Sequence, residues 1–106
     1  MVQPDLAKWG GLTGCLPVAK KIIKAGARYC PHYLGAGIGL VASAHLLAAV
    51  GGDGQLEVDA NPNPLRQDLC GPMRNVSESH VQLGEAPGLG FEPDFNQFKR
   101  YRVAIA

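Results

Sequence analysis

Three side chains that could do acid–base chemistry follow three successive predicted strands: Asp5, His32 and Glu57. The working residues of βα architectures sit where strands end, so these side chains face one opening if the strands are parallel neighbours. An Asp beside a His fixes the tautomer of the imidazole and raises its basicity. A Glu can form a hydrogen bond with a substrate oxygen where charge develops. Each residue also has a purely structural interpretation, as a loop cap, a hydrogen-bonded loop histidine and a solvated strand end.

Strands and helices alternate through the first sixty residues, and this order positions the three side chains. Apolar residues recur with helical spacing, and glycines and prolines stand where the elements end. We expect the tail of a strand at 1–3, a helix over 15–25, a strand over 27–30, a helix over 40–50 and a strand over 56–59. Such alternation is typical of βαβ units and a parallel sheet, which places the chain in the α/β class.

The second half of the chain has weaker signals. Pro62 and Pro64 end the last strand, because neither residue can donate to a ladder. We expect a loop or short helical turn around 65–69, and further strands over 79–83 and 101–105. The chain as a whole, residues 1–106, is interpreted as one small domain.

Composition excludes several classes of function. The chain has 106 residues, 46% of them hydrophobic, and a formal net charge of +1, which argues against a basic nucleic-acid surface. Three widely spaced cysteines are too few for a disulfide framework and indicate free thiols in a reducing compartment. The opening residues show no basic and apolar leader pattern, so we expect a cytoplasmic protein.

Four segments resemble, in order, the C-terminal part of one enzyme family. The segments are Pro4–Gly14, Pro31–His32 with Tyr33 and Leu34, Leu56–Asp59 with Asn61 and Pro62, and Pro87–Phe91 with the closing 101–103. They resemble the enolase superfamily, in its mandelate racemase/muconate lactonizing enzyme family, with an acid-sugar dehydratase-like pattern. The resemblance implies the last three strands or so of a (β/α)7β barrel. It divides residues 1–106 into a strand-end, helix, strand, helix, strand unit over 1–60 and a tail over 61–106 that returns toward a missing capping domain.

The resemblance also implies a chemistry. His32 would be the general base and acid, Asp5 its orienting partner, and Glu57 a contact of the substrate carboxylate. The family implies Mg²⁺, because an α-proton beside a carboxylate is too weak an acid for an imidazole unless a metal stabilises the dianion. The metal-binding carboxylates of the family have no counterpart in this chain. We therefore expect a C-terminal fragment of a dehydratase, racemase or epimerase, with a carboxylate or acid-sugar substrate for the complete enzyme and no activity for the chain alone.

Two alternatives concern what the chain does as it stands. A slice of a barrel exposes two strand edges and an apolar face, so we expect self-association or binding to the missing barrel part. A non-catalytic truncated protein or an assembly module is therefore the alternative function. A small membrane protein with one span near residues 33–52 is a minor alternative, because that stretch has no Asp, Glu, Lys or Arg.

Overall fold

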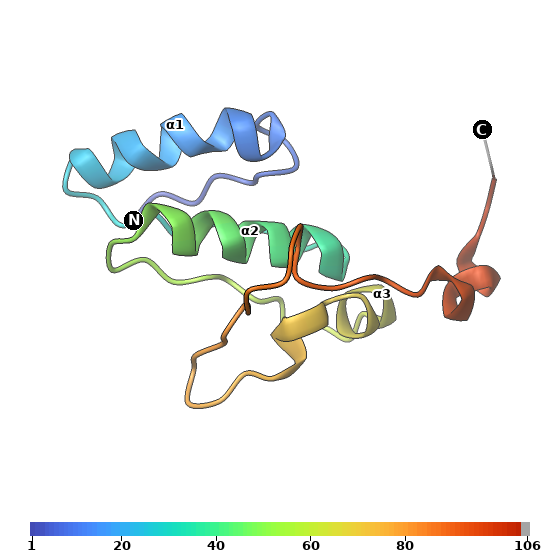
Figure 1. Cartoon of the computed structure of the whole chain (residues 1–106). Coiled ribbons are helices and arrows are strands. Elements are labelled where there is room, and N and C mark those ends of the chain that lie inside the picture. The colour runs from blue at the N-terminus through green and yellow to red at the C-terminus, as the bar shows by residue number, and fades with distance from the viewer. Residues whose placement is uncertain (105–106) are drawn as a thin grey trace.

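The computed structural model describes residues 1–104 and is built around two long helices that lie side by side (Figure 1). The elements are α1 (Gly11–Lys24), α2 (Gly37–Val50), the short α3 (Pro64–Asp68) and the 3₁₀ helices η1 (Gly71–Arg74) and η2 (Phe95–Tyr101). Helix α3 and η1 pack against α2, and the chain then runs out to η2, whose Phe98 is buried. Both predicted helices are present, and each begins earlier in the structure than the sequence predicts.

Helix α1 forms because its apolar residues share one face. Cys15 and Ala19 are fully buried, while the lysines at 20, 21 and 24 are exposed on the other side. The helix begins at Gly11, four residues before the predicted start, since Gly10 takes the capping position. It ends at Lys24, and Gly26 follows with a φ of 72°, as the predicted glycine stop requires.

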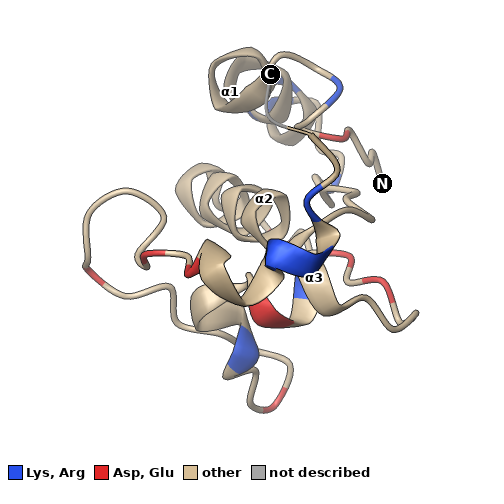
Figure 2. Ribbon diagram, turned by 90° about the vertical axis from the view of Figure 1, so that its right-hand side faces the viewer, with Lys and Arg blue, Asp and Glu red and all other residues tan. Residues whose placement is uncertain are grey.

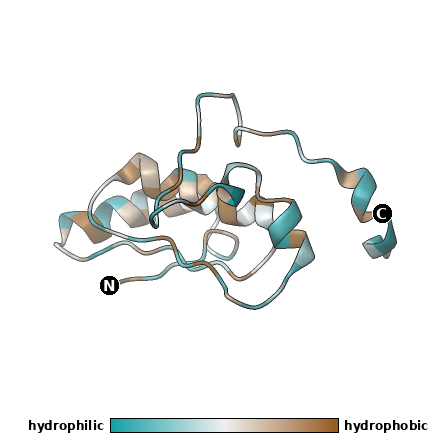
Figure 3. Cartoon of the chain, turned by 90° about the horizontal axis from the view of Figure 1, so that it is seen from below, coloured by the Kyte–Doolittle hydropathy of each residue, from teal (hydrophilic) through white to brown (hydrophobic). Residues whose placement is uncertain are grey.

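Helix α2 is mostly apolar around its whole circumference and is covered on two sides. Figure 3 shows the hydropathy of each residue along the chain. Ala42 and Leu46 pack with Cys15, Ala19 and Tyr29 toward α1. On another side, Leu40, Val41 and Ala44 pack with Cys70 and Met73. A helix that is hydrophobic all round must be buried in this way, so α2 is the element on which the other parts of the chain assemble.

The predicted strands over 27–30, 56–59 and 79–83 are wrong as regular strands. The described residues contain only two isolated bridges, a parallel one between Val2 and Tyr29 and an antiparallel one between Ser77 and His80 that closes a tight turn. A ladder needs successive bridges, and Pro4 and Pro31 remove two of the N–H donors that would extend it. The strand predicted over 101–105 is also absent at 101–104, where Tyr101 ends η2, and Ile105 lies outside the described residues.

The three extended segments nonetheless lie in register. Residues 28–32 run between residues 1–5 and residues 54–58. On one side the Val2 N–H donates to the Arg28 carbonyl (2.8 Å), the Cys30 N–H to Val2 (3.0 Å) and the His32 N–H to Pro4 (3.3 Å). On the other side the Glu57 N–H donates to the Pro31 carbonyl (3.3 Å). The bridge between Val2 and Tyr29 is parallel. In the third segment Gly54 lies against Tyr29 and Glu57 against Pro31, so all three segments run in one direction, with 28–32 in the middle.

One glycine permits the close approach of the third segment. A Cβ at Gly54 would collide with the carbonyl oxygen of Tyr29. Since glycine has no Cβ, residues 54–58 can lie directly beside the central segment.

Among the described helices, none combines the length and the apolar character needed to cross a bilayer. Helix α2 has 14 residues and begins only at Gly37. The minor alternative of a span near residues 33–52 is therefore wrong for the described chain, because Tyr33–Ala36 are not helical and Gly51 ends the helix.

A buried arginine anchors the loop that follows Glu57. The Arg66 guanidinium, in α3, forms an ion pair with Asp59 (3.2 Å) and also donates to the Asn61 carbonyl. Asp59 accepts hydrogen bonds from the backbone and side chain of Asn61 at 2.9 and 2.8 Å. The backbone hydrogen bond from Asn61, and with it the charge of Arg66, lowers the pKa of the Asp59 carboxyl. Asp59, Asn61 and Arg66 therefore tie the third segment to α3.

Leu46→Ala is expected to destabilise the chain by about 2–5 kcal/mol, because it leaves a cavity between α1 and α2. Leu46 is 3% exposed. Urea unfolding followed by circular dichroism measures the loss. Leu34→Ala removes the same atoms from a side chain that is 49% exposed and should change stability little. Equal effects of the two substitutions would contradict the buried position of Leu46.

Acid is expected to weaken the chain partly through Asp59. Because folding lowers the pKa of this carboxyl, its contribution is complete above the pKa of an unperturbed Asp, about 3.9, and is lost as the pH falls through the lower folded-state value. Asp59→Asn should therefore make stability less dependent on pH in that acid range. Urea midpoints across the range measure this, and Glu85→Gln, at an exposed carboxyl, is the matched control. An unchanged acid slope in Asp59→Asn would rule out this contribution.

Candidate functional site

The three extended segments bring His32 and Glu57 into direct contact. Glu57 Oε2 lies 2.8 Å from His32 Nδ1, and the two side chains are 39% and 35% exposed. An ionised carboxylate can only accept, so the neutral imidazole carries its proton on Nδ1 and donates it to Glu57. The other ring nitrogen, Nε2, then has a free lone pair and can take a proton from a bound molecule.

Gln3 joins this pair from the first segment. Its side-chain Nε2 donates to the same Glu57 oxygen at 2.8 Å. The segments around 3, 32 and 57 thus contribute one side chain each to a single hydrogen-bonded cluster, which we call the Gln3–Glu57–His32 cluster.

The Asp5 carboxylate bonds to groups of its own turn rather than to the Gln3–Glu57–His32 cluster. Its Oδ1 accepts from the Ala7 N–H (2.8 Å), and its Oδ2 forms an ion pair with Lys8 (3.3 Å). The side chain is 11% exposed, whereas Lys8 is 75% exposed. Among the described residues Asp5 has no hydrogen bond with His32, although the His32 backbone N–H bonds to the carbonyl of the preceding Pro4. The structure therefore places Asp5 next to the contact between the segments with both oxygens occupied by its own turn.

The Gln3–Glu57–His32 cluster and the buried Tyr29 lie on opposite sides of the extended segments. Gln3, His32 and Glu57 meet on one side, while Tyr29 lies in the core against α1 and α2. Alternation between faces is the property of extended backbone, and it persists here without a regular ladder. The side of the segments opposite the cluster therefore packs against helices α1 and α2.

Two titratable groups on that side are held neutral. Burial, and to a smaller extent the charge of Asp5, raises the pKa of the Cys15 thiol. Burial raises the pKa of Tyr29 to about 12, with a further contribution from Cys15. Both side chains are at most 1% exposed, so they support the segments rather than react.

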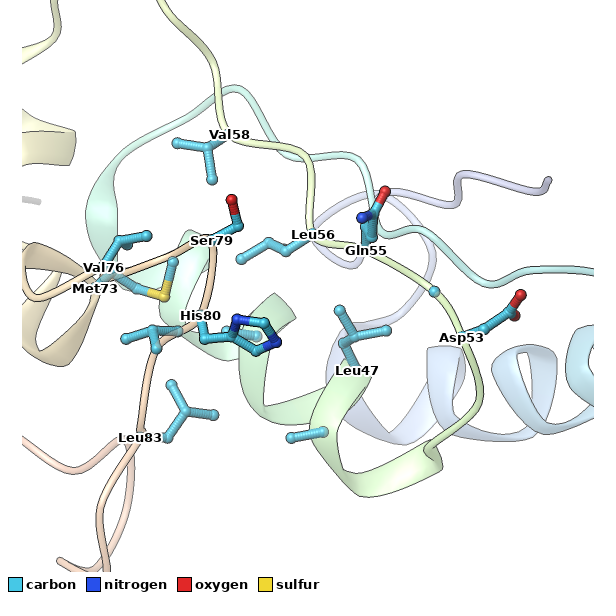
Figure 4. Close-up of a pocket in the computed structure, with 14 residues that line it drawn as sticks. Leu47, Asp53, Gln55, Leu56, Val58, Met73, Val76, Ser79, His80 and Leu83 are labelled. Carbon is cyan, nitrogen blue, oxygen red and sulfur yellow. The ribbon is translucent and has the colours of Figure 1, made fainter.

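Leu56 and Val58 line a separate groove of about 670 Å³ between α2, the third segment and residues 73–83 (Figure 4). Leu47 of α2 and Leu83 also point into it (Figure 4). Its polar members, including Asp53 and His80, are not part of the Gln3–Glu57–His32 cluster. The groove and the cluster are therefore different sites.

No metal-binding group is formed by the described residues. Within 1–104 there is no cluster of three or more His, Cys, Asp or Glu side chains that could hold an ion. The residues present do not fit the Mg²⁺ that the resemblance implies. Figure 2 shows both signs of charged residue along the ribbon, and the formal net charge of the chain is +1.

Sequence reasoning selected Asp5, His32 and Glu57 but missed Gln3. The order of strand ends was enough to bring His32 and Glu57 together. Gln3 stands two residues before Asp5, on the same face of an extended segment, and this parity is the signal that could have identified it.

Comparison with known proteins gives one consistent result. A family model described as "Enolase C-terminal domain-like" matches residues 1–97. A solved structure of a mandelate racemase/muconate lactonizing enzyme from Bordetella bronchiseptica RB50 is similar with a TM-score of 0.87 and 60% sequence identity. That match covers 92% of this chain and 28% of the other.

Two curated relatives are more distant. The arabinonate dehydratase of Saccharolobus solfataricus is 26% identical over 102 residues, covering 96% of this chain and 27% of the relative. The D-galactarolactone cycloisomerase of Agrobacterium fabrum is 27% identical over 111 residues, covering 97% and 29%. The chain thus spans less than a third of the length of these relatives.

Proposed function

The chain belongs to the enolase superfamily, in its mandelate racemase/muconate lactonizing enzyme family, and we propose that it is the C-terminal part of an enzyme that removes the proton α to a carboxylate. The contact between Glu57 and His32 is the observation that carries this proposal. Both residues lie within the range 1–97 that the family model matches.

In the proposed reaction the α-proton of the substrate moves to a ring nitrogen of His32. His32 accepts the α-proton, and the electron pair of the C–H bond stays on the substrate and spreads into its carboxylate. In the role that the resemblance implies, Glu57, 2.8 Å from the ring, contacts the substrate carboxylate. Return of the proton to the other face gives epimerisation or racemisation, and loss of a β-hydroxyl gives dehydration.

Asp5 is the second acidic partner in the proposal. The family resemblance gives it the orienting role, and its position one residue after Pro4, which binds the His32 backbone, supports its presence at the site. In that role its carboxylate must leave Lys8, an exposed side chain that can turn away into water.

The three extended segments would be the last three strands of a (β/α)7β barrel. Their common direction and the similarity to a solved family member support this. The family implies Mg²⁺, whose ligands would have to come from residues outside this chain, since the described part holds no such cluster. We therefore assign no activity to the chain alone.

The substrate class is an acid sugar. The names of two relatives, an arabinonate dehydratase and a D-galactarolactone cycloisomerase, support this class. The three cysteines, all free and buried, fit a cytoplasmic enzyme.

A chimera tests the proposal. Residues 1–97 would replace the matching C-terminal part of the Bordetella bronchiseptica relative, which is 60% identical. In D₂O with Mg²⁺, the chimera should exchange the α-proton of at least one acid sugar in a panel, measured by ¹H NMR. His32→Asn should lower this rate about 10²- to 10⁴-fold, the usual contribution of a general base.

His80→Asn is the control for the chimera, since His80 is exposed and its ring contacts the carbonyl of the nearby Glu78 (2.8 Å). A folded chimera in which His32→Asn keeps full exchange would refute the assignment of the base. The chain alone, in the same assay, should show no turnover.

A second candidate function is an assembly module, favoured by the open edges of the three segments. Among residues 1–104 the backbone N–H groups of Gln3, Leu56 and Val58 have no hydrogen-bond partner. Unpaired edge groups are a template for further strands, from a second copy or from the missing barrel part. We propose that the isolated chain self-associates through them.

Val58→Pro should reduce this self-association, because proline removes the backbone N–H donor at the open edge, at a residue that is 51% exposed. Light scattering after gel filtration gives the mass at several concentrations, and Val58→Ala is the matched control. A compact, cooperatively folded monomer of the unmodified chain would contradict the proposal that the chain is an assembly module.

A further inference from the structure

The three extended segments leave two edges, and these edges differ in sequence. Residues 28–32 lie in the middle, so the first segment forms one edge of the row and the third segment forms the other. In Figure 1, α1 and the first segment lie on one side of α2 and the third segment lies on the other. Within the described chain the backbone N–H and carbonyl of Gln3 are unpaired at the first edge, and those of Leu56 and Val58 are unpaired at the third.

The hydrogen bonds between the first two segments show how two such edges fit together. Val2 donates its N–H to one residue of the central segment (2.8 Å) and accepts from the residue two positions further on (3.0 Å), which is the pattern of a parallel pair. Repeated between two copies, this pattern joins Gln3 of one copy to the Leu56 carbonyl and the Val58 N–H of the next. Both partners of Gln3 then run in the direction that the three segments already share.

This pairing also keeps each face of the segments continuous. Gln3 and Glu57 meet on one side of the segments. Val58 lies on the opposite side, where it lines the groove beside α2, and Val2 faces that side too because it pairs with the buried Tyr29. Val2 and Val58 are 43% and 51% exposed in the single chain. Contact between the two edges would remove part of this apolar surface from water, which stabilises the contact.

The distribution of charge favours a contact between unlike edges. Residues 1–28, which include the first segment and α1, carry five Lys and Arg against one Asp. Residues 29–62, which include the third segment, carry three Asp and Glu and no Lys or Arg. A first edge against a third edge therefore brings opposite charges together, whereas two first edges or two third edges bring like charges together.

We propose that the chain assembles head to tail, with the Gln3 edge of one copy adding in parallel to the Leu56 and Val58 edge of the next. The inference rests on the proposed self-association and names the two surfaces that meet in it. Because the two surfaces differ, each contact leaves one edge open at either end of the assembly. The assembly therefore grows beyond two copies as the concentration rises.

Two proline variants, measured alone and mixed, test the head-to-tail contact. Gln3→Pro removes the N–H of the first edge and Val58→Pro removes one N–H of the third edge, and neither N–H is used within the described chain. Each variant alone should associate about 5- to 100-fold more weakly than the unmodified chain, since a carbonyl or N–H at the contact loses its partner. Light scattering after gel filtration should then give the mass of one chain.

An equal mixture of the two proline variants should give the mass of two chains. Gln3→Pro keeps an intact third edge and Val58→Pro keeps an intact first edge, so one contact can form. The assembly should stop at two chains, because both outer edges of the pair are blocked. If either variant alone still pairs, like edges meet and the head-to-tail contact is wrong. A mixture that stays at the mass of one chain contradicts it as well.

Gln3→Ala and Val58→Ala are the matched controls, because they shorten the same side chains and keep the backbone N–H. Both should grow with concentration nearly as the unmodified chain does. Far-ultraviolet circular dichroism should be the same in all four variants, since none of the substitutions lies in α1 or α2. Alanine variants that lose association as completely as the proline variants would assign the effect to the side chains and overturn the edge contact.

Salt provides a second measurement on the unmodified chain, which does not depend on the folding of any variant. At about 1 M NaCl the Debye length falls to about 3 Å, so attraction between unlike edges is screened. The association constant should fall about 2- to 5-fold for each exposed ion pair across the contact. An association constant that rises with salt would show like charges at the contact and would refute the inference.

These measurements separate the inference from the proposed assembly module. A chain that stays monomeric at every concentration removes the module and the head-to-tail contact with it. Association that persists in Gln3→Pro alone or in Val58→Pro alone keeps the module and removes only the head-to-tail contact.

Discussion

The arrangement of the site depends on the hydrogen bonds that the central segment, residues 28–32, forms with a neighbour on each side. Three backbone bonds fix the first segment beside it, and the Glu57 N–H fixes the third. These bonds set the heights at which Gln3, His32 and Glu57 leave the backbone. Since none of the three side chains is fully buried, packing alone would not hold Gln3 and His32 each 2.8 Å from Glu57. Helices α1 and α2 contribute by filling the apolar layer behind the segments, where Tyr29 and Leu46 meet.

The two main helices and the meeting of His32 with Glu57 were predictable from the sequence, because both follow from local patterns. Helical spacing of apolar residues marks α1 and α2, and the ends of successive extended runs mark the acid and the base. The regular strands were not predictable. Whether an extended run becomes a strand depends on partners on both sides, and residues 1–5 and 54–58 each have one neighbour in this chain. Both helices begin earlier than predicted, because glycine in a sequence pattern indicates a loop, whereas Gly10 caps α1 and Gly37 is the first residue of α2.

The resemblance gives the orienting role to Asp5, and this role stays a prediction. In the structure the Asp5 carboxylate bonds to the Ala7 N–H and to Lys8. An aspartate that follows a proline and precedes a lysine by three residues can bond to groups of its own turn instead of to a distant side chain. Which of these bonds it forms depends on side-chain rotamers rather than on the sequence pattern. Glu57 has a longer side chain and no such competitor nearby, so it reaches the ring. Gln3 was overlooked because an amide has no titratable group to draw attention.

The absence of a side chain at Gly54 has an evolutionary implication. Even an alanine at position 54 would collide with the Tyr29 carbonyl. Because Glu57 lies three residues downstream, this collision would move its carboxylate away from His32. In a comparison of descendants of this gene, position 54 should tolerate replacement only where the histidine has also been lost. Gly54 has no reactive group, yet its presence or loss in each lineage would then show whether the reaction of the site is still under selection.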